Sequence, residues 1–468
     1  MKKQKTHIFR CTGCGHEESK WLGRCPECGE WNTLTETTVS SPGRLGLSRS
    51  GAPGAIPQSL PLSSVDPQEG SRISSGIGEL DRVLGGGMMK RSAILVGGEP
   101  GIGKSTLLLQ AAAAAKTKGR VLYISGEESA GQIRMRADRL GLSGERIEIF
   151  CSGRIEDIQR VLDSVKPVMV IADSVQTLFT PEVGVVPGTV NQMKYCSHEL
   201  ISWVKEHDAV LLLVAHVTKD GIIAGPKTLE HMVDTVLYFE QNDADTRFLR
   251  ATKNRFGSVD EIGIFTMGET GLTAVDDPSS LFLVRREGEL PPGIATAAVL
   301  EGTRTLLVEI QALVVPAKGS MSRVFSDRID SARVSRVAAT LEKHLSLRLS
   351  DHDLYVNVAG GIRIAEVGVE LALAAALHSA RTGLALPERT AIAGELTLAG
   401  EVRPIRRLAG RIKTARGLSF DHFIGPKIDG GDRPAEGSQA GRETWTGVKD
   451  LKSGIQAIFT LDGAKKIR

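Results

Sequence analysis

Between residues 71 and 275, short apolar runs alternate with longer stretches whose apolar residues recur at helical spacing. Short apolar runs are typical of buried strands, and the helical period is typical of helices that cover them. The alternation therefore predicts an α/β domain, with a largely parallel sheet and helices on both faces. The predicted strands are 93–96, 120–125, 147–151, 168–172 and 209–215, and the predicted helices are a stretch ending near Ala115 and 130–140, 155–165 and 192–206.

Three later stretches, 233–240, 246–252 and 261–267, alternate between apolar and polar residues. Such alternation is typical of an antiparallel sheet with one solvated face. We therefore expect these stretches to extend the sheet in antiparallel fashion.

The pattern changes again after Asp277. Residues 281–316 are expected to form strands with a turn at 301–305, and 327–347 has the apolar stripe of an amphipathic helix. An Ala- and Leu-rich run at 367–379 predicts a buried helix, and 394–405 predicts a hairpin around Gly400.

Two regions precede the α/β domain. Residues 37–70 contain many Ser, Pro and Gly residues without hydrophobic periodicity, which predicts a flexible linker. Four of the six cysteines lie before it. We therefore expect four parts, 1–36, 37–70, 71–275 and 276–468, since a chain of 468 residues is too long for one core.

The overall composition narrows the class of protein only slightly. The chain is 41% hydrophobic and 24% charged, as ordinary globular proteins are. Its net charge of +3 is too small to indicate a nucleic-acid partner by itself. The first residues lack the apolar core of a secretory signal, and no apolar run is long enough for a membrane span. We therefore expect a cytoplasmic protein without membrane contact.

A candidate nucleotide site follows the first predicted strand. Gly98, Gly103, Lys104 and Ser105 fit the pattern G-x-x-x-x-G-K-[ST] between a strand and a helix, which is the context of a phosphate loop. Glycines let backbone N–H groups surround a polyphosphate, and the helix N-terminus favours negative charge. Lys104 would reach the β- and γ-phosphates, and Ser105 would ligate Mg²⁺. The alternative is a glycine-rich turn. The predicted ATP-binding residues are Gly97, Gly98, Glu99, Pro100, Gly101, Ile102, Gly103, Lys104, Ser105 and Thr106.

Acidic residues follow two further predicted strands. Asp173 ends an apolar run, as does the carboxylate that holds Mg²⁺ through water in such enzymes. Glu127 and Glu128 follow the strand 120–125, and one of them could polarise the attacking water. The alternative is a helix N-terminus enriched in acids. His216 ends the strand 209–215, where it could sense the γ-phosphate or serve only the structure.

The four N-terminal cysteines form two C-x-x-C pairs, Cys11 and Cys14, then Cys25 and Cys28. This spacing predicts a tetrahedral Zn²⁺ site, and four thiolates leave no open position for catalysis. So small a module would depend on the metal for its folding energy. The alternatives are two disulfides or a redox pair, and His16 could replace one ligand. Cys151 and Cys196 are isolated, and we expect both to be buried.

Several motifs together resemble the RadA (Sms) family of bacterial DNA-repair proteins. They are SGIGELDRVLGGG, GGEPGIGKST, YISGEES, VIADSVQT, VAHVTKDG and KNRFG, behind the cysteine pairs. The resemblance implies a RecA-like ATPase, related to hexameric replicative helicases, with ATP between neighbouring subunits. Glu127 would be the catalytic carboxylate and His216 the sensor. Lys253 and Arg255 would reach the neighbour's nucleotide or couple ATP hydrolysis to DNA. Without the resemblance, the residues of KNRFG would favour an ordinary basic hairpin with a glycine turn.

The last domain resembles the proteolytic domain of Lon in the hairpin GELTLAGEVRPI. Extending this resemblance places Gly368 and Ala409 where Lon has its catalytic Ser and Lys, and neither can act as nucleophile or base. We therefore expect a Lon-like fold without peptidase activity. Four arginines are candidates for a DNA-lining surface or for a solvated helix face: Arg323, Arg328, Arg333 and Arg336.

The favoured hypothesis is a DNA-dependent ATPase that forms a hexameric ring on single-stranded and branched DNA. The resemblance implies branch migration in RecA-mediated recombination, repair of DNA breaks, and a zinc module that contacts RecA or DNA. The alternatives are an ATP-dependent Lon-type protease, a nucleotide-gated DNA-binding scaffold and a strand-exchange recombinase. The expected cofactors are ATP, Mg²⁺ and Zn²⁺.

Overall fold

The chain forms two compact units in a computed structural model. The structure describes residues 7–14, 16–18, 20–38, 61, 71–184, 186–216, 228–241, 246–275, 277–284, 286, 288, 290–319, 322–428 and 445–461. Unit one takes its described residues from Met1–Glu240, Leu249–Val259 and Met267–Thr273, and unit two takes the others. Nearly all of the predicted linker 37–70 lies outside the described residues.

The N-terminal module is a small three-stranded sheet of order β2-β1-β3. Its strands are β1 (His7–Cys11), β2 (Glu17–Glu18) and β3 (Leu34–Thr38), and β1 pairs antiparallel with both neighbours. Cys11, Cys25 and Leu34 are the buried residues of its core. Such a core is too small to stabilise a fold without a further cross-link or metal.

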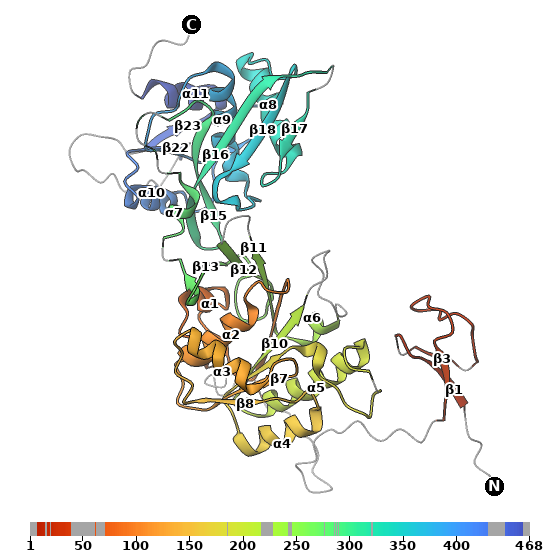
Figure 1. Cartoon of the computed structure of the whole chain (residues 1–468). Helices are drawn as coiled ribbons and strands as arrows, with labels where there is room; N and C mark the ends of the chain where they lie inside the picture. The colour runs from red at the N-terminus through yellow and green to blue at the C-terminus, as the bar shows by residue number, and fades with distance from the viewer. Residues whose placement is uncertain are drawn as a thin grey trace, which may run out of the picture. The chain divides into compact units, whose positions relative to one another are not determined.

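Unit one contains most of a nine-stranded sheet with the order β14-β13-β12-β11-β6-β10-β9-β7-β8, while most of β13 and the ends of β12 and β14 are counted with unit two. Figure 1 shows the helices α2 to α5 around the strands of this sheet. The elements are β4 (Arg72–Ile73), α1 (Gly78–Val83), β5 (Met88–Met89), β6 (Ser92–Gly98), α2 (Lys104–Ala114), β7 (Val121–Ser125), α3 (Ala130–Arg139), β8 (Ile147–Phe150), α4 (Ile155–Val165), β9 (Met169–Asp173), η3 (Val175–Thr177), α5 (Val190–Glu206), β10 (Val210–His216), α6 (Thr228–Met232), β11 (Thr235–Gln241), β12 (Thr246–Asn254), β13 (Ile262–Gly268) and β14 (Gly271–Ala274). The predicted alternation of strands and helices is confirmed.

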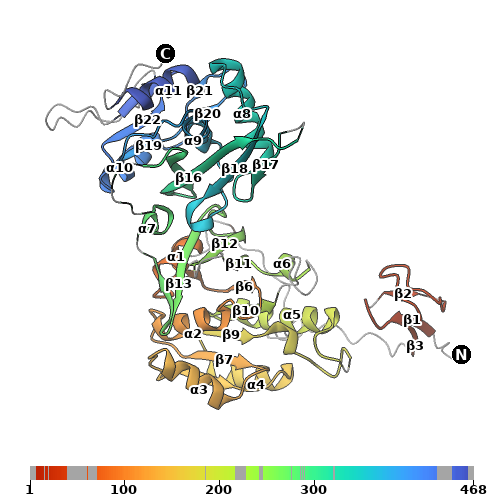
Figure 2. The same ribbon diagram turned by 45° about the horizontal axis from the view of Figure 1, so that its top comes forward.

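The strands β11, β6, β10, β9, β7 and β8 are parallel neighbours. Helices α4 and α5 bury apolar residues against one face, where Leu95, Val170 and Leu213 point. Residues that alternate with these, such as Ile94 and Leu212, are buried on the other side, where α2 packs on β6, β9 and β10 (Figure 2). Parallel strands buried on both faces explain the continuous apolar runs of the sequence.

The expected antiparallel extension is wrong for its first strand. β11 pairs in parallel with β6, with Val236 opposite Leu95 and Tyr238 opposite Gly97. The short helix α6 precedes β11, so this strand is one more unit of the parallel crossover series. The first three residues of β11 are all buried. The alternation of polar and apolar residues in this strand therefore does not correspond to one solvated face.

Unit two contains a seven-stranded sheet of order β17-β18-β16-β15-β19-β22-β23. Its elements are α7 (Ser279–Phe282), β15 (Ile294–Glu301), β16 (Arg304–Pro316), β17 (Val324–Ser326), α8 (Ser331–Leu345), β18 (His352–Val358), η4 (Ala359–Gly361), η5 (Val367–Val369), α9 (Glu370–Thr382), β19 (Thr390–Ile392), β20 (Glu395–Leu396), β21 (Val402–Arg403), α10 (Leu408–Gly417), β22 (His422–Pro426), β23 (Trp445–Val448) and α11 (Leu451–Thr460). The predicted hairpins are present, with Glu301 opposite Arg304 and Glu395 opposite Arg403.

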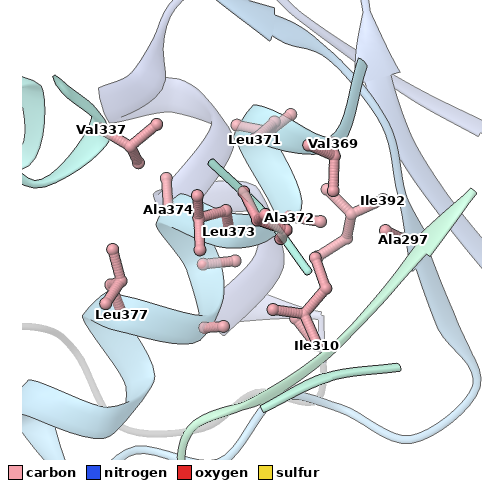
Figure 3. Packing of buried hydrophobic residues seen from close by; sticks show 14 of the residues in the cluster. Ala297, Ile310, Val337, Val369, Leu371, Ala372, Leu373, Ala374, Leu377 and Ile392 are labelled. Atoms are coloured by element: carbon pink, nitrogen blue, oxygen red, sulfur yellow. The ribbon is translucent and has the colours of Figure 1, made fainter. Parts of the chain in front are cut away.

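Helix α9 is the centre of unit two. Its residues from Glu370 to Ser379 are all buried, and Figure 3 shows Leu373 and Leu377 among the side chains of the surrounding elements. The observed helix begins three residues later than predicted, because residues 367–369 form a 3₁₀ turn. The predicted strand at 281 is also wrong, since α7 covers 279–282. Within the described residues, none of the helices combines the length and apolar character that crossing a bilayer requires.

Candidate active site and zinc module

The phosphate loop lies at the carboxyl end of β6, and its ten predicted residues run from the end of that strand into the first turn of α2. Gly101 and Gly103 have φ values of 79° and 113°, which side-chain-bearing residues rarely adopt. A Cβ on Gly103 would lie 2.6 Å from Cε of Met267. Glycine is therefore required at Gly103 by the backbone conformation, whereas the flexible end of Met267 could move aside for a Cβ.

Lys104 is almost completely buried at the start of α2. Its ammonium donates hydrogen bonds to the carbonyl oxygens of Gly98 at 2.7 Å and Glu99 at 2.9 Å. Burial lowers the pKa of Lys104, and the nearby carboxylates of Asp173 and Glu127 oppose this shift. The charged group therefore lies inside the loop, where a polyphosphate would replace the carbonyl oxygens as its partner.

The ends of four parallel strands bring the predicted acids to the same sheet edge as the loop. Ser125 lies opposite Asp173, and His216 lies opposite Gly98. Asp173 is 9% exposed, and its Oδ2 accepts a hydrogen bond of 2.5 Å from the hydroxyl of Tyr123. The carboxylate is thus fixed beside the loop, as a group that orients the water shell of Mg²⁺ must be. Together with Ser105 in the first turn of α2, it fits the donor set that Mg²⁺ prefers.

A second cluster lies at the same edge around Glu127. The hydroxyl of Ser174 donates a hydrogen bond of 2.6 Å to Oε1 of Glu127, and Nε2 of His216 lies 3.6 Å from the same oxygen. The other ring nitrogen of His216 is buried and has no hydrogen-bond partner among the residues that the structure describes. This arrangement could hold a water molecule and sense the group that arrives next to it.

Lys253 and Arg255 lie at the opposite edge of the sheet. Arg255 pairs with the buried carboxylate of Asp234 at 3.2 Å, and Asp234 Oδ2 accepts a hydrogen bond from the backbone of Ala93 at the start of β6. The seven residues of β6 separate this edge from the phosphate loop by roughly 20 Å. The chain therefore does not bring these two residues to its own loop.

The ammonium of Lys253 is bound by backbone carbonyl groups of its own subunit. It donates hydrogen bonds to the carbonyl oxygens of Glu230, His231 and Val233, at 2.7, 3.3 and 2.7 Å. These are the carbonyls at the end of α6, where a cation is favourable because it satisfies unpaired acceptors. Burial lowers the pKa of Lys253, and the neighbouring Arg255 lowers it further.

In unit two, the position predicted for a Lon-like serine is occupied by Gly368, beside a buried ion pair. The guanidinium of Arg411 is completely buried and binds both carboxylate oxygens of Glu366 as well as the carbonyl of Ala298. A Cβ on Gly368 would lie 2.6 Å from Glu366 Oε1 and 3.1 Å from Arg411 Nη1. Ala409 lies in α10. Gly368 thus offers no nucleophile, and a side chain at this position would have to displace the ion pair of Glu366 and Arg411.

The four predicted arginines of unit two do not form one free basic surface. Arg333 donates to the carbonyl oxygens of Glu366 and Ala365, and its side chain is only 13% exposed. Arg336 lies 3.5 Å from the buried carboxylate of Glu370, and Arg323 forms a bidentate contact with Asp353. Arg336 and Arg323 therefore neutralise buried acids while more than half of each side chain stays exposed, and Arg333 is a poor candidate for DNA contact.

The four N-terminal cysteines converge on one point. All four Sγ atoms lie within 4.8 Å of one another, with 3.6 Å between Cys11 and Cys28 and 3.5 Å between Cys14 and Cys25. Four sulfurs at about 2.3 Å from a tetrahedral zinc ion would be separated by about 3.8 Å. The residues thus fit Zn²⁺. The two isolated cysteines differ, since Cys196 is buried as expected but Cys151 is exposed.

Sequence reasoning missed Tyr123 and Ser174, which contact the two predicted acids. One signal for Tyr123 was present: a tyrosine in the centre of an otherwise aliphatic strand is buried, and its hydroxyl then needs a polar partner. Ser174 had no comparable signal, because a serine after a strand is common.

Comparisons with known proteins define the class of this chain. The family model described as "Rubredoxin metal binding domain" matches residues 9–36, and the ATPase family model described as "KaiC" matches residues 73–149. The protein is therefore a RecA- and KaiC-like P-loop ATPase behind a zinc ribbon.

Curated relatives identify the family. The DNA repair protein RadA of Treponema pallidum is 58% identical over 91% of this chain and 93% of its own length. The proteins of the same name from Brucella abortus and Bacillus subtilis are 46% and 42% identical, and they are covered over 91% and 95% of their lengths. The chain belongs to the RadA family.

Proposed function

We propose that this protein is a DNA-dependent ATPase that acts in DNA repair. The observation that carries the proposal is the single sheet edge at which Lys104, Asp173 and Glu127 meet. The printed names of the relatives add the process, since each is called a DNA repair protein.

The chain's residues would divide the work at the nucleotide. The loop amides and Lys104 would neutralise the phosphates, and Ser105 and Asp173 would hold Mg²⁺, which would supply further charge neutralisation there. Glu127 accepts a proton from the attacking water, and His216 contacts the γ-phosphate from the neighbouring strand. The burial of Lys104 and Asp173 strengthens their electrostatic contacts.

We propose further that the active form is a ring, with six subunits as in hexameric helicases. The argument is geometric, because Arg255 is exposed at the sheet edge remote from its own loop. In a head-to-tail ring, that edge could meet the loop of the next subunit. Arg255 would then stabilise the neighbour's phosphates or transmit their state to DNA.

The ring would translocate on single-stranded DNA and drive branch migration of intermediates in RecA-mediated recombination and break repair. The zinc module would contact RecA or DNA. Unit two is proposed to be Lon-like and non-proteolytic, because Glu366 and Arg411 fill the space beside Gly368. The protein is expected in the cytoplasm.

A branched-DNA assay tests this function. The full chain, with ATP and Mg²⁺, should convert a synthetic three-stranded recombination intermediate into product, and Lys104→Ala should not. Strand exchange from free substrates without RecA would instead support the recombinase alternative. ATP-dependent fragments of unfolded casein would support the protease.

A further inference from the structure

We infer that Tyr123, Arg136 and Glu128 form a relay that holds the carboxylate of Asp173 in the one orientation that serves Mg²⁺. The inference rests on the proposed ATPase function. It adds three positioning residues to a site in which only Asp173 and Ser105 are assigned to the metal.

The first link of the relay is buried inside the sheet. Tyr123 is completely buried in β7, opposite Ile171 of β9, so its ring lies on the same side of the sheet as Asp173 two residues further along. Its hydroxyl donates a hydrogen bond of 2.5 Å to Asp173 Oδ2. A short bond from a buried phenol to a carboxylate is among the stronger neutral-to-charged hydrogen bonds.

The second link fixes the direction of the first. Arg136 in α3 donates a hydrogen bond of 3.2 Å from Nη2 to the Tyr123 oxygen. Because a guanidinium has only donors, the phenolic oxygen must accept here, and its single proton is left for Asp173. Hydrogen bonds arranged in this way polarise one another.

The third link anchors the guanidinium. Arg136 contacts both oxygens of Glu128, at 3.1 Å from Nη1 and 2.8 Å from Nη2. Glu128 lies next to Glu127 and precedes the capping box of Ser129 and Gln132 that starts α3. The relay therefore runs from the helix start through Arg136 and Tyr123 to the end of β9.

The relay has a direct consequence for the metal. Tyr123 donates to Oδ2, and no residue in the described part of the chain donates to Oδ1, so Oδ1 is the oxygen without a protein donor and the one most available to the metal and its water shell. A carboxylate that is held before Mg²⁺ arrives loses no rotational freedom on binding. The partners of metal-binding groups commonly set metal affinity in this way.

The test removes the hydroxyl of Tyr123 and measures nucleotide binding rather than ATP hydrolysis. In Tyr123→Phe, binding of a fluorescent ATP analogue is measured at equilibrium while Mg²⁺ is titrated. The Mg²⁺ concentration at half-maximal effect should rise about tenfold. Binding of the analogue in EDTA should stay at the wild-type level. Tyr195→Phe is the matched control, because Tyr195 lies on α5 of unit one and its hydroxyl also contacts a carboxylate, that of Glu182, at 3.5 Å.

A second variant, Arg136→Gln, distinguishes action through Tyr123 from a general contribution of these residues to the packing of the core. Arg136→Gln alone should raise the Mg²⁺ midpoint in the same direction. In Tyr123→Phe combined with Arg136→Gln, the midpoint should be no higher than in Tyr123→Phe alone, since Arg136 acts through the phenol. If Tyr123→Phe does not fold, as judged by thermal melting, Arg136→Gln decides by itself.

An unchanged Mg²⁺ midpoint in a folded Tyr123→Phe or Arg136→Gln variant would overturn the relay. So would an additive effect of the two substitutions, or a loss of nucleotide binding in EDTA. A wild-type chain without Mg²⁺-dependent nucleotide binding would contradict the proposed ATPase function instead.

Discussion

The Ser174 hydroxyl and the Glu127 carboxylate are joined by a hydrogen bond of 2.6 Å, although 47 positions separate them in sequence. Ser174 is completely buried directly after Asp173, whereas the Glu127 side chain is 48% exposed. A buried donor thus holds an exposed acid at the sheet edge where the attacking water would lie. The bond links the proposed general base to the strand that carries the proposed Mg²⁺ ligand.

Removing this bond should slow hydrolysis without abolishing nucleotide binding. In Ser174→Ala, the kcat of ATP hydrolysis should fall about tenfold, because a general base must be oriented as well as present. The KM for ATP should change much less. Ser197→Ala is the control, since its buried hydroxyl has no partner among the described residues. Equal kcat values in the two variants would show that Ser174 does not orient Glu127.

Arg255 should act on the site of another subunit. Lys104→Ala and Arg255→Gln subunits are each expected to be inactive alone. A 1:1 mixture should recover activity at about one quarter of the interfaces, those that combine an intact loop with an intact arginine from the neighbour. Steady-state ATP hydrolysis after subunit exchange measures this. No recovery in mixtures whose exchange is verified by labelled subunits would contradict action between subunits.

The pair of Arg411 and Glu366 should be a main determinant of the stability of unit two. Arg411→Met leaves Glu366 without its charged partner in a mostly buried place, which should lower the free energy of unfolding by about 3–5 kcal/mol. Urea unfolding measures the change. Lys413→Met, on the exposed side of the same helix, should have little effect. Similar decreases in the free energy of unfolding in both variants would show that the pair of Arg411 and Glu366 does not determine the stability of unit two.

Removal of zinc should unfold the N-terminal module and leave the nine-stranded sheet intact. One Zn²⁺ per chain should be released by a thiol-reactive mercurial, and Cys28→Ser should bind the metal more weakly. The module should then become sensitive to protease, since its buried core is very small. Protease resistance after complete metal release would contradict a metal-dependent fold. Because protons compete for thiolates, zinc should also be lost as the pH falls.

Much of the fold could be predicted because its signals are local. The apolar runs of β6, β9 and β10 and the glycines of the phosphate loop depend only on neighbouring residues and period. The direction of β11 was predicted wrongly, because parallel and antiparallel pairing depends on the crossover before the strand. A strand's own pattern does not contain that information.

The sequence motifs predicted the main residues of the site, but they did not predict the hydrogen bonds that hold these residues in place. Lys104 and Asp173 were found because a phosphate loop and a strand-end acid have fixed local contexts. The contacts of Tyr123, Ser174 and Arg136 arise from tertiary packing between strands and a helix, which no spacing encodes. The same holds for Arg333, which looked like part of a basic helix face and instead binds backbone carbonyls.

Steady-state ATP hydrolysis with and without single-stranded DNA tests the central claim most directly, with Lys104→Ala as the control. The account predicts turnover that rises when DNA is added and disappears in the variant, since Lys104 is the buried cation of the loop. Turnover that DNA does not change would contradict a DNA-dependent ATPase and would direct attention to a protein substrate. Absence of turnover in both conditions would contradict it as well and would favour a nucleotide-gated scaffold.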